Sequence, residues 1–217
     1  CQAARTSRVL SEFKVDGVDT NIPFLQNLLR HEQFVRADVH TSFVDEQGGT
    51  ALHWAANGGS SEIVKALIAD GANVDAVDEK MFTALHWAAK CGRPNDIEAL
   101  VAAGAPLNAT TKAGVTPLIY AASEGWDDCV PLLLDAGARA DAKDIAGYTL
   151  FHRCTCGPKQ AWDTLLEIGH MLIGSRADPN AYNRFGNAPL EEVSMKGSVE
   201  PALLLLEAGA NPLQRVG

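Results

Sequence analysis

The residue types best suited to holding a metal ion lie close together at His152, Cys154 and Cys156. On an α-helix, residues four apart lie on one face, so His152 and Cys156 have a spacing that could ligate zinc. His170 is nearby in the sequence, but a fourth ligand is not evident. We therefore expect no metal or other cofactor here, with a zinc site and redox-sensitive cysteines as the two alternatives.

Three histidines, His152 among them, have a spacing from a threonine that could place a base beside a hydroxyl group. Each histidine follows a threonine by three residues, and the pairs are Thr50–His53, Thr83–His86 and Thr149–His152. A catalytic triad needs a nucleophile together with a base that a third group orients. No such convergent acid, base and nucleophile appear in the sequence, so we expect no catalytic residue and a protein that is not an enzyme.

The spacing of these threonines shows an internal repeat. Thr50, Thr83, Thr116 and Thr149 are each 33 residues apart, and a glycine series keeps the same step at Gly71, Gly104 and Gly137. The next equivalents, Ala188 and Arg176, are each shifted to a step of 39 residues. Both shifts predict a six-residue insertion in the fourth copy, in the segment GPKQAWDTLLEIGHMLIGS, where it would lengthen the second helix.

Each copy predicts the same local structure. In GGTALHWAAN (48–57), Leu52, Ala55 and Ala56 have helical spacing after a threonine that can cap the helix. SSEIVKALIAD (60–70) then carries an apolar stripe for a second helix, and Gly71 ends it. GANVDAVD lacks helical periodicity and carries turn residues, so it predicts a hairpin-like loop.

These segments resemble the ankyrin repeat family. The first-helix copies are GGTALHWAANGG, MFTALHWAAKCG, GVTPLIYAASEG, GYTLFHRCTCGP and GNAPLEEVSMKG, and the loops are GANVDA, GAPLNA, GARADA, RADPNA and GANPLQ. The resemblance implies an all-α ankyrin-repeat solenoid of five helix–turn–helix–hairpin repeats at 45–77, 78–110, 111–143, 144–182 (with the insertion) and 183–215. Three departures from the family pattern are Met81 for the hairpin glycine and Ile119 and Glu191 for the histidine.

The resemblance also implies roles for the residues singled out above. The threonine and histidine of each pair are expected to satisfy backbone groups within and between repeats. Cys154 occupies the small buried alanine position of the repeat, which favours a structural role. Asn108 and Asn180 lie in loops of the kind that asparaginyl hydroxylase modifies in ankyrin proteins, with ordinary turn asparagines as the alternative.

Residues 1–45 show no ankyrin pattern. A helix through Phe13, a strand near Lys14–Val18 and a second helix after Thr20–Asn21 predict a short α+β segment. FKVDGVDTNIPFLQNLLRHEQF, ending in HTSFVDE, resembles the C-terminal end of the biotin carboxylase domain, closest to pyruvate-carboxylase-like members. Asp19 departs from the family's usual lysine. The ATP-grasp motifs of that family are absent here, and Met195–Lys196 is only a faint echo of its biotinyl motif.

The proposed contact residues occupy the usual ankyrin positions on the concave face and the hairpin tips. Trp54, Trp87, Tyr120 and Arg153 share one repeat position, where they either pack between repeats or form an aromatic strip that binds a partner. Phe82, Ile145, Tyr148 and Phe185 are apolar where solvent is expected, which marks a protein contact or hairpin-to-hairpin packing. The candidates for partner binding are Gln47, Trp54, Asn57, Lys80, Phe82, Trp87, Lys90, Val115, Tyr120, Glu124, Tyr148, Arg153 and Phe185.

Composition narrows the partner. The 217 residues carry a net charge of −9, which argues against nucleic acid as a ligand. Residues 46–217 hold 13 basic and 21 acidic side chains, so we expect a protein partner with basic and apolar groups.

No apolar run approaches the length of a membrane span. Five cysteines do not read as a disulfide framework, which favours an intracellular, cytoplasmic protein, although an upstream targeting signal could precede Cys1. We also expect the protein to be a monomer. The alternative function is a C-terminal piece of a biotin-dependent carboxylase fused to ankyrin repeats, inactive in this fragment.

Overall fold

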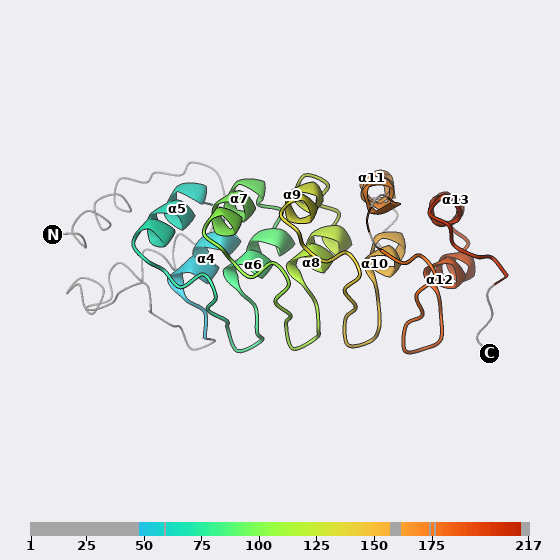
Figure 1. The fold of residues 1–217 in the computed structure, drawn as a ribbon, viewed down its shortest axis with the longest axis horizontal. Coiled ribbons are helices and arrows are strands. Elements are labelled where there is room, and N and C mark those ends of the chain that lie inside the picture. Colours follow the sequence, from blue (N-terminus) through green and yellow to red (C-terminus); the bar gives the residue numbers. More distant parts are fainter. Residues whose placement is uncertain (1–47, 59, 157–161, 174, 176, 214–217) are drawn as a thin grey trace.

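The computed structural model describes residues 48–58, 60–156, 162–173, 175 and 177–213, which form five helix pairs stacked in a row (Figure 1). The first helices of the pairs are α4 (Ala51–Gly58), α6 (Ala84–Lys90), α8 (Pro117–Glu124), α10 (Leu150–Cys156) and α12 (Pro189–Lys196). The second helices are α5 (Ser61–Ala69), α7 (Pro94–Ala102), α9 (Cys129–Asp135), α11 (Trp162–Ile173) and α13 (Val199–Glu207).

The two sets of helices form two layers. First helices lie in one layer and second helices in the other, and a hairpin loop projects beyond the first-helix layer between successive repeats (Figure 1). No strand occurs in the described ranges. The prediction of an all-α solenoid is therefore confirmed for these residues. The α+β segment predicted before residue 46 lies outside the described residues, so the division into domains and repeats stays a prediction.

Local sequence explains where the first helices begin and end. The Thr83 hydroxyl oxygen accepts a hydrogen bond from the backbone N–H of His86, and Thr116 does the same for Ile119. Pro117 occupies the first turn of α8, where its missing N–H costs nothing. Gly125 ends the same helix in the left-handed conformation, at φ 79°. The threonine cap thus recurs at the starts of α6 and α8, whereas Ala188 takes its place before α12.

The core lies between the layers. Small buried residues on the first helices allow close approach of the neighbouring repeats, as at Ala88 and Ala89 in α6. Longer side chains from the second helices fill the space between the layers, and Leu100 and Leu133 are fully buried. These residues belong to one continuous apolar cluster that runs through all five repeats. Burial against neighbours, rather than helix propensity, therefore stabilises helices of only seven to twelve residues.

The fourth repeat departs from the others at its second helix. α11 spans 12 residues, whereas α5, α7 and α13 span 9 and α9 spans 7. The first part of the predicted insertion, residues 157–161, lies outside the described residues. Gly169 of α11 faces α13 so closely that a Cβ there would come within 2.0 Å of Leu204 Cδ2. This contact joins the longer helix to the last repeat.

Hydrogen bonds fix the shape of each hairpin loop. Asp78 Oδ1 accepts from the backbone N–H groups of Lys80 and Phe82, both at 2.8 Å. Asp144 and Asn183 make the corresponding bonds in later loops, at 2.8–3.0 Å. Backbone bonds then join each turn to the next, and they are Lys112 N to Lys80 O, Ile145 N to Ala113 O and Arg184 N to Ala146 O, at 2.9–3.0 Å. The turns therefore form a continuous hydrogen-bonded row along the solenoid.

One position of the hairpin turn is glycine in four of its five copies, Gly48, Gly114, Gly147 and Gly186. At Gly114, φ is +73° and a Cβ would come within 2.8 Å of Ile145 N, the donor of the bond between turns. Met81 holds the same position with φ 64°, the only non-glycine residue with positive φ in the described part of the chain. The left-handed conformation costs a side-chain-bearing residue roughly 1–2 kcal/mol.

Replacing Met81 by glycine is expected to stabilise the protein. The relief of backbone strain outweighs the greater freedom of glycine in the unfolded chain, leaving about 0.5–1 kcal/mol. Urea unfolding of Met81→Gly, compared with Met81→Leu as the control that keeps a Cβ, measures this gain. A midpoint no higher than that of the wild type would show that Met81 carries no strain.

Asp96 places a buried carboxyl group at a second-helix position that is apolar in the neighbouring repeats. The equivalent residues 33 positions away are Ile63 and Cys129, which are apolar and buried. Neither oxygen of the Asp96 carboxyl group has a hydrogen-bond partner. Burial raises the pKa of Asp96, opposed in smaller part by the Ser61 hydroxyl, which is nearby but outside hydrogen-bonding geometry, and by the charge of Arg93. An acidic side chain thus stands where the repeat otherwise places an apolar one.

Asp96→Val is expected to raise the free energy of unfolding at pH 7 by about 1–3 kcal/mol, because it removes an unsatisfied buried carboxylate. Since the folded-state pKa of Asp96 is raised, the stability of the wild type falls as the pH rises from 3.8 through that pKa. The gain should therefore shrink at lower pH. Glu98→Val, on the exposed face of the same helix, is the control and should change little.

Candidate functional site

The three histidine–threonine pairs form the same hydrogen-bonded arrangement. In the second repeat, His86 Nδ1 lies 3.0 Å from the backbone N of Thr83 and 2.9 Å from its Oγ1, and Nε2 lies 3.1 Å from the carbonyl oxygen of Val115. His53 and His152 repeat these contacts, with their Nε2 atoms on the carbonyl oxygens of Phe82 and Asn187 at 2.9 and 3.1 Å. Each imidazole thus ties its own helix start to the next hairpin loop.

This geometry defines the protonation state of His86. A backbone N–H can only donate, so Nδ1 must carry a lone pair, and Nε2–H must donate to the carbonyl group. Burial lowers the pKa of His86 to about 4, and the pKa of His152 is lowered for the same reason. Both ring nitrogens are engaged within the fold, so these imidazoles are structural residues rather than candidates for a catalytic base.

The two repeats that lack the histidine differ in whether another side chain accepts the backbone N–H at the start of the first helix. Glu191 in the fifth repeat accepts the backbone N–H of Ala188 through Oε2 at 2.8 Å, in place of an imidazole nitrogen. Ile119 in the third repeat offers no side-chain acceptor, and only the threonine cap is kept there, with Ile119 N–H donating to Thr116 Oγ1 at 3.3 Å as His86 N–H does to Thr83 Oγ1. Glutamate therefore replaces part of the histidine's function, whereas isoleucine replaces only its volume.

The proposed metal ligands are only partly described. The side chains of Cys154 and Cys156 lie outside the described residues. His152 is described, and its Nδ1 and Nε2 lie 3.2 and 3.1 Å from Thr149 N and Asn187 O. A metal at this imidazole would have to displace one of these bonds. Among the side chains that the structure describes, no group of three or more His, Cys, Asp and Glu residues could hold a metal ion.

The side chains of the inner column, which we define as Trp54, Trp87, Tyr120 and Arg153, are each partly exposed. Phe82 lies between two of them, with ring centroids 5.1 Å from Trp87 and 5.3 Å from Tyr120. The inner column thus combines packing between repeats with accessible surface. Binding of a partner by this surface stays a prediction.

The prediction that Phe82 is exposed is wrong. Its side chain is 8% exposed, because the rings of Trp87 and Tyr120 cover it from two successive repeats. Val115, at the equivalent position one repeat later, is also only 8% exposed. Hairpin-to-helix packing, rather than partner contact, therefore accounts for these two residues.

Two cations lie over the aromatic rings of this face. Lys90 Nζ lies 5.1 Å from the ring centroid of Trp87, 5.8 Å from that of Phe82 and 5.9 Å from that of Tyr120. Arg153 lies 4.9 Å over the ring of Tyr148 and forms an ion pair with Asp144. Such contacts hold long basic side chains in place at modest cost in entropy. The face therefore presents positioned positive charges beside aromatic carbon.

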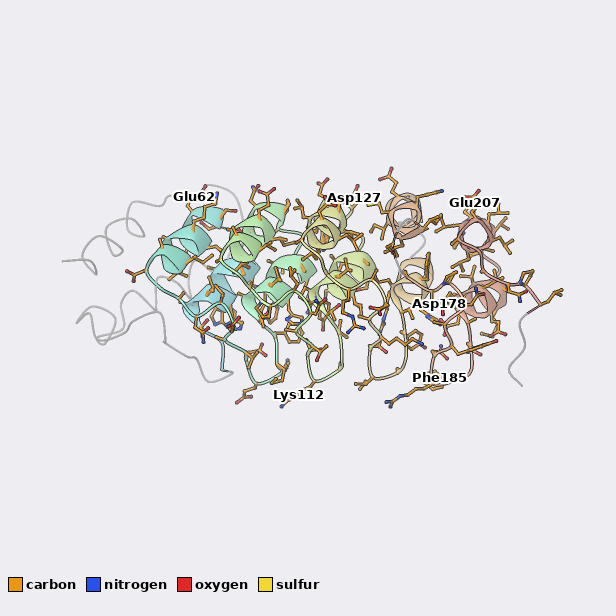
Figure 2. The ribbon with its side chains drawn as sticks, in the orientation of Figure 1. Glu62, Lys112, Asp127, Asp178, Phe185 and Glu207 are labelled. Carbon is orange, nitrogen blue, oxygen red and sulfur yellow. The ribbon has the colours of Figure 1, made fainter. Side chains whose placement is uncertain are left out.

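The tip row, which we define as residues 79–81, 112–114, 145–147 and 184–186, carries the most exposed apolar side chains of the hairpins. Met81, Ile145 and Phe185 are 43%, 54% and 70% exposed. The repeat pattern predicts exposed apolar side chains at Ile145 and Phe185, whereas it marks Met81 only as a departure from the hairpin glycine. Lys112 and Phe185 lie at the ends of their loops, on the side away from the second helices (Figure 2).

The remaining candidates are Asn57, Lys80, Glu124, Tyr148 and Gln47. Asn57 Oδ1 accepts a hydrogen bond from Cys91 Sγ at 3.2 Å, and burial raises the pKa of that thiol. Lys80 and Glu124 are exposed, and Tyr148 is partly exposed. Gln47 lies outside the described residues. Trp126, which sequence analysis did not single out, donates from Nε1 to Lys90 O at 2.9 Å.

Asn108 and Asn180 link consecutive loops. The backbone N–H of Arg139 donates to Asn108 Oδ1 at 2.8 Å, and that of Asn211 donates to Asn180 Oδ1 at 2.7 Å. Asn180 Nδ2 also donates to Gly209 O at 3.0 Å. These bonds give both asparagines a structural role in joining one repeat to the next. Whether either is hydroxylated stays a prediction.

The stacked helix pairs and projecting hairpins define a helical-repeat solenoid, a class that buries its core between neighbouring repeats and presents an extended surface. The family model described as "Ankyrin repeats (3 copies)" matches residues 18–111 and 97–215. The chain therefore belongs to the ankyrin repeat family. Ankyrin repeats are protein-interaction modules and are typically not enzymes, so the family supports a binding role.

A short stretch of the chain is similar to a second family. Pyruvate carboxylase, mitochondrial, of Mus musculus is 57% identical over 44 residues, which is 20% of this chain and 4% of that protein. The Homo sapiens protein of the same name is 54% identical over 44 residues, and pyruvate carboxylase of Bacillus subtilis is 49% identical over 43 residues. The chain thus spans about 4% of the length of these relatives. The carboxylase resemblance is confirmed as short and partial.

None of the helices in the described ranges has the length and apolar character needed to cross a bilayer.

Proposed function

We propose that this protein recognises another protein through its tip row and inner column. The observation that carries the proposal is the exposure of Ile145 and Phe185 on turns that backbone hydrogen bonds hold in one row. Exposed apolar side chains on a fixed scaffold are typical of protein contacts, because binding removes apolar area from water without first ordering the loops. We further propose that the protein acts as a monomer inside the cell, in the cytoplasm, and takes no cofactor.

A comparative pull-down with the full chain tests this proposal. Proteins captured by the wild type should be lost with Phe185→Ser and retained with Leu203→Ser, since Leu203 is an exposed apolar residue of α13 in the opposite layer. Circular dichroism melts of both variants confirm that each is folded. If both variants capture the same proteins as the wild type, or lose the same ones, the tip row is not the binding surface.

Trp87→Ala is expected to weaken partner binding more than it weakens the fold. Trp87 is partly exposed and packs on Phe82 and under Lys90 Nζ, so its loss should cost about 1–2 kcal/mol of stability. A central aromatic of an interface is worth at least about 2 kcal/mol of binding. Chemical unfolding and binding to a captured partner give the two values. A stability loss equal to that of Leu67→Ala would mean that Trp87 belongs to the core.

A second candidate function follows from the short carboxylase matches. On this hypothesis the chain is one end of a longer biotin-dependent ligase that carries an ankyrin module. Sequencing the complete transcript decides the matter, because a ligase requires an upstream ATP-grasp domain with its glycine-rich loop. A transcript without that domain removes this candidate and leaves recognition alone.

A further inference from the structure

The charges of this protein are divided between its two layers. Exposed carboxylates gather on the second-helix side, and they are Glu62, Asp70, Glu98, Asp128, Asp135, Glu167, Glu200 and Glu207. Glu62, Asp127 and Glu207 lie along this edge in Figure 2, on the side opposite Lys112 and Phe185. The net charge of −9, which counts the whole chain, therefore does not describe how charge is distributed between the two sides of the solenoid.

The tip row carries the opposite sign. Lys80, Lys112 and Arg184 are exposed there, and none of them forms an ion pair with a described residue. Glu79 is the one acidic residue within the four turns. In chain order these cations alternate with the exposed apolar side chains of Met81, Ile145 and Phe185. The hairpins that carry them follow one another along the long axis of the molecule (Figure 1).

The carboxylates next to the tip row do not cancel this charge toward a partner. Asp78 Oδ1 accepts two backbone N–H groups, and Asp144 does the same while pairing with Arg153. Glu191 caps the start of α12, and Glu192 accepts from Asn183 Nδ2 at 2.7 Å. Their charge is directed into the fold. Lys90, held over three rings, has three N–H donors and adds a positive group on the first-helix side, where the exposed Glu124 at the end of α8 is an acidic one.

We propose that the partner is a protein segment rich in acidic and apolar side chains, which lies along the tip row. Its carboxylates would bind Lys80, Lys112 and Arg184, and its apolar groups would cover Ile145 and Phe185. This inference rests on the proposed function and reverses the expectation, drawn from net charge alone, of a basic partner. A polyanion such as RNA fits less well, because its phosphates gain nothing from the apolar side chains and are repelled by the acidic layer.

Selection from a phage-displayed library of random 16-residue peptides against the full chain tests this chemistry without a known partner. The expected result is enrichment of peptides that combine net negative charge with aromatic or aliphatic residues. Binding of the enriched peptides should weaken about three- to tenfold in Lys112→Glu, because like charges then meet in the contact. Phe185→Ser should weaken it by a similar factor, through lost apolar burial.

Two matched variants locate the effect. Lys65→Glu makes the same charge change on an exposed lysine of α5, and Leu203→Ser makes the same kind of apolar change on α13; both should leave binding unchanged within about twofold. Enriched peptides that are basic would overturn the inference while keeping the proposed function. Acidic peptides whose binding is equally weakened by the control variants would place the site elsewhere and overturn it too.

The remaining outcomes are also decisive. A library that yields no enriched peptide counts against the proposed function itself. Binding of a 30-residue poly-uridine RNA, or of vesicles containing phosphatidylserine, that is lost in Lys112→Glu would replace the protein segment with a nucleic acid or a membrane surface. Neither polyanion is expected to bind at 150 mM salt, where exposed charges alone are strongly screened.

Discussion

The free energy of unfolding is expected to fall by about 2–3 kcal/mol between pH 7 and pH 4.5 through His86 alone. The pKa of His86 is about 4 in the folded protein, below its ordinary value of 6.5, because the ring is buried. The unfolded chain therefore binds more protons than the folded one in this window, and stability is lost as the pH falls from 6.5 toward 4. His152 acts in the same direction, since its pKa is also lowered by burial.

The physical cause is the tautomer that the hydrogen bonds require. A proton on His86 Nδ1 would point at the backbone N–H of Thr83, 3.0 Å away, so that two donors face each other. Asp96 opposes this trend, because its raised pKa makes the folded state easier to protonate in acid. The net slope should still be downward in acid, since two imidazoles are set against one carboxyl group.

Urea unfolding at pH 7, 6, 5 and 4.5 measures this dependence. His86→Gln should be less stable at pH 7, because glutamine cannot reproduce both imidazole bonds, but its stability should fall less steeply in acid. His170→Gln is the matched control, since His170 is exposed in α11 beside Glu207, and its profile should follow that of the wild type. Parallel profiles for wild type and His86→Gln would show that this imidazole does not titrate in the window.

Leu133→Ala is expected to destabilise the protein by about 2–5 kcal/mol, the range for removing a fully buried leucine. Leu133 lies in α9, has no exposed surface and belongs to the apolar cluster between the layers. The helix α9 packs against α8 of its own repeat and α7 of the preceding repeat, which cannot both collapse into the space left behind. Leu67→Ala in α5 should also fall within this range, toward its lower end, because that side chain is 8% exposed.

Guanidinium unfolding gives both values, with Leu203→Ala as the control. Leu203 is an exposed leucine in α13, so its truncation should cost less than about 0.5 kcal/mol. A loss below about 1 kcal/mol for Leu133→Ala would mean that the middle of the solenoid is loosely packed. A change in the slope with denaturant, rather than in the midpoint, would instead indicate that the repeats no longer unfold together.

The helices and their caps were predictable because the same apolar spacing, capping threonine and glycine recur in successive copies of the repeat. Thr83 and Thr116, at the same position in successive copies, both cap a first helix, and the glycine steps mark the turns. The exposure of apolar hairpin residues was harder to predict. Phe82 directly precedes the capping threonine and packs under the next repeat, whereas Phe185 lies three residues before the N-cap residue, Ala188, and faces solvent. Register relative to the cap, rather than residue type, separates the two.

The distribution of charge and the surroundings of buried polar groups could not be predicted from the sequence. Comparison of Asp96 with Ile63 and Cys129 marks an unusual residue, but only the packing shows that its carboxyl group has no partner. The distribution of charge depends on which face each loop presents, so net charge alone gives an expectation for the partner opposite to the one that we propose from the tip row. The ion pair of Arg153 with Asp144 likewise follows from the shape of the hairpin.

The bonds that join one repeat to the next have a consequence for how the chain acquires its fold. His53 to Phe82, Asn108 to Arg139, His152 to Asn187 and Trp126 to Lys90 span 29, 31, 35 and 36 residues. Each closes a loop of about one repeat, so the entropy lost at each step is nearly the same along the described solenoid. Such low contact order favours rapid folding that spreads outward from whichever neighbouring pair of repeats forms first.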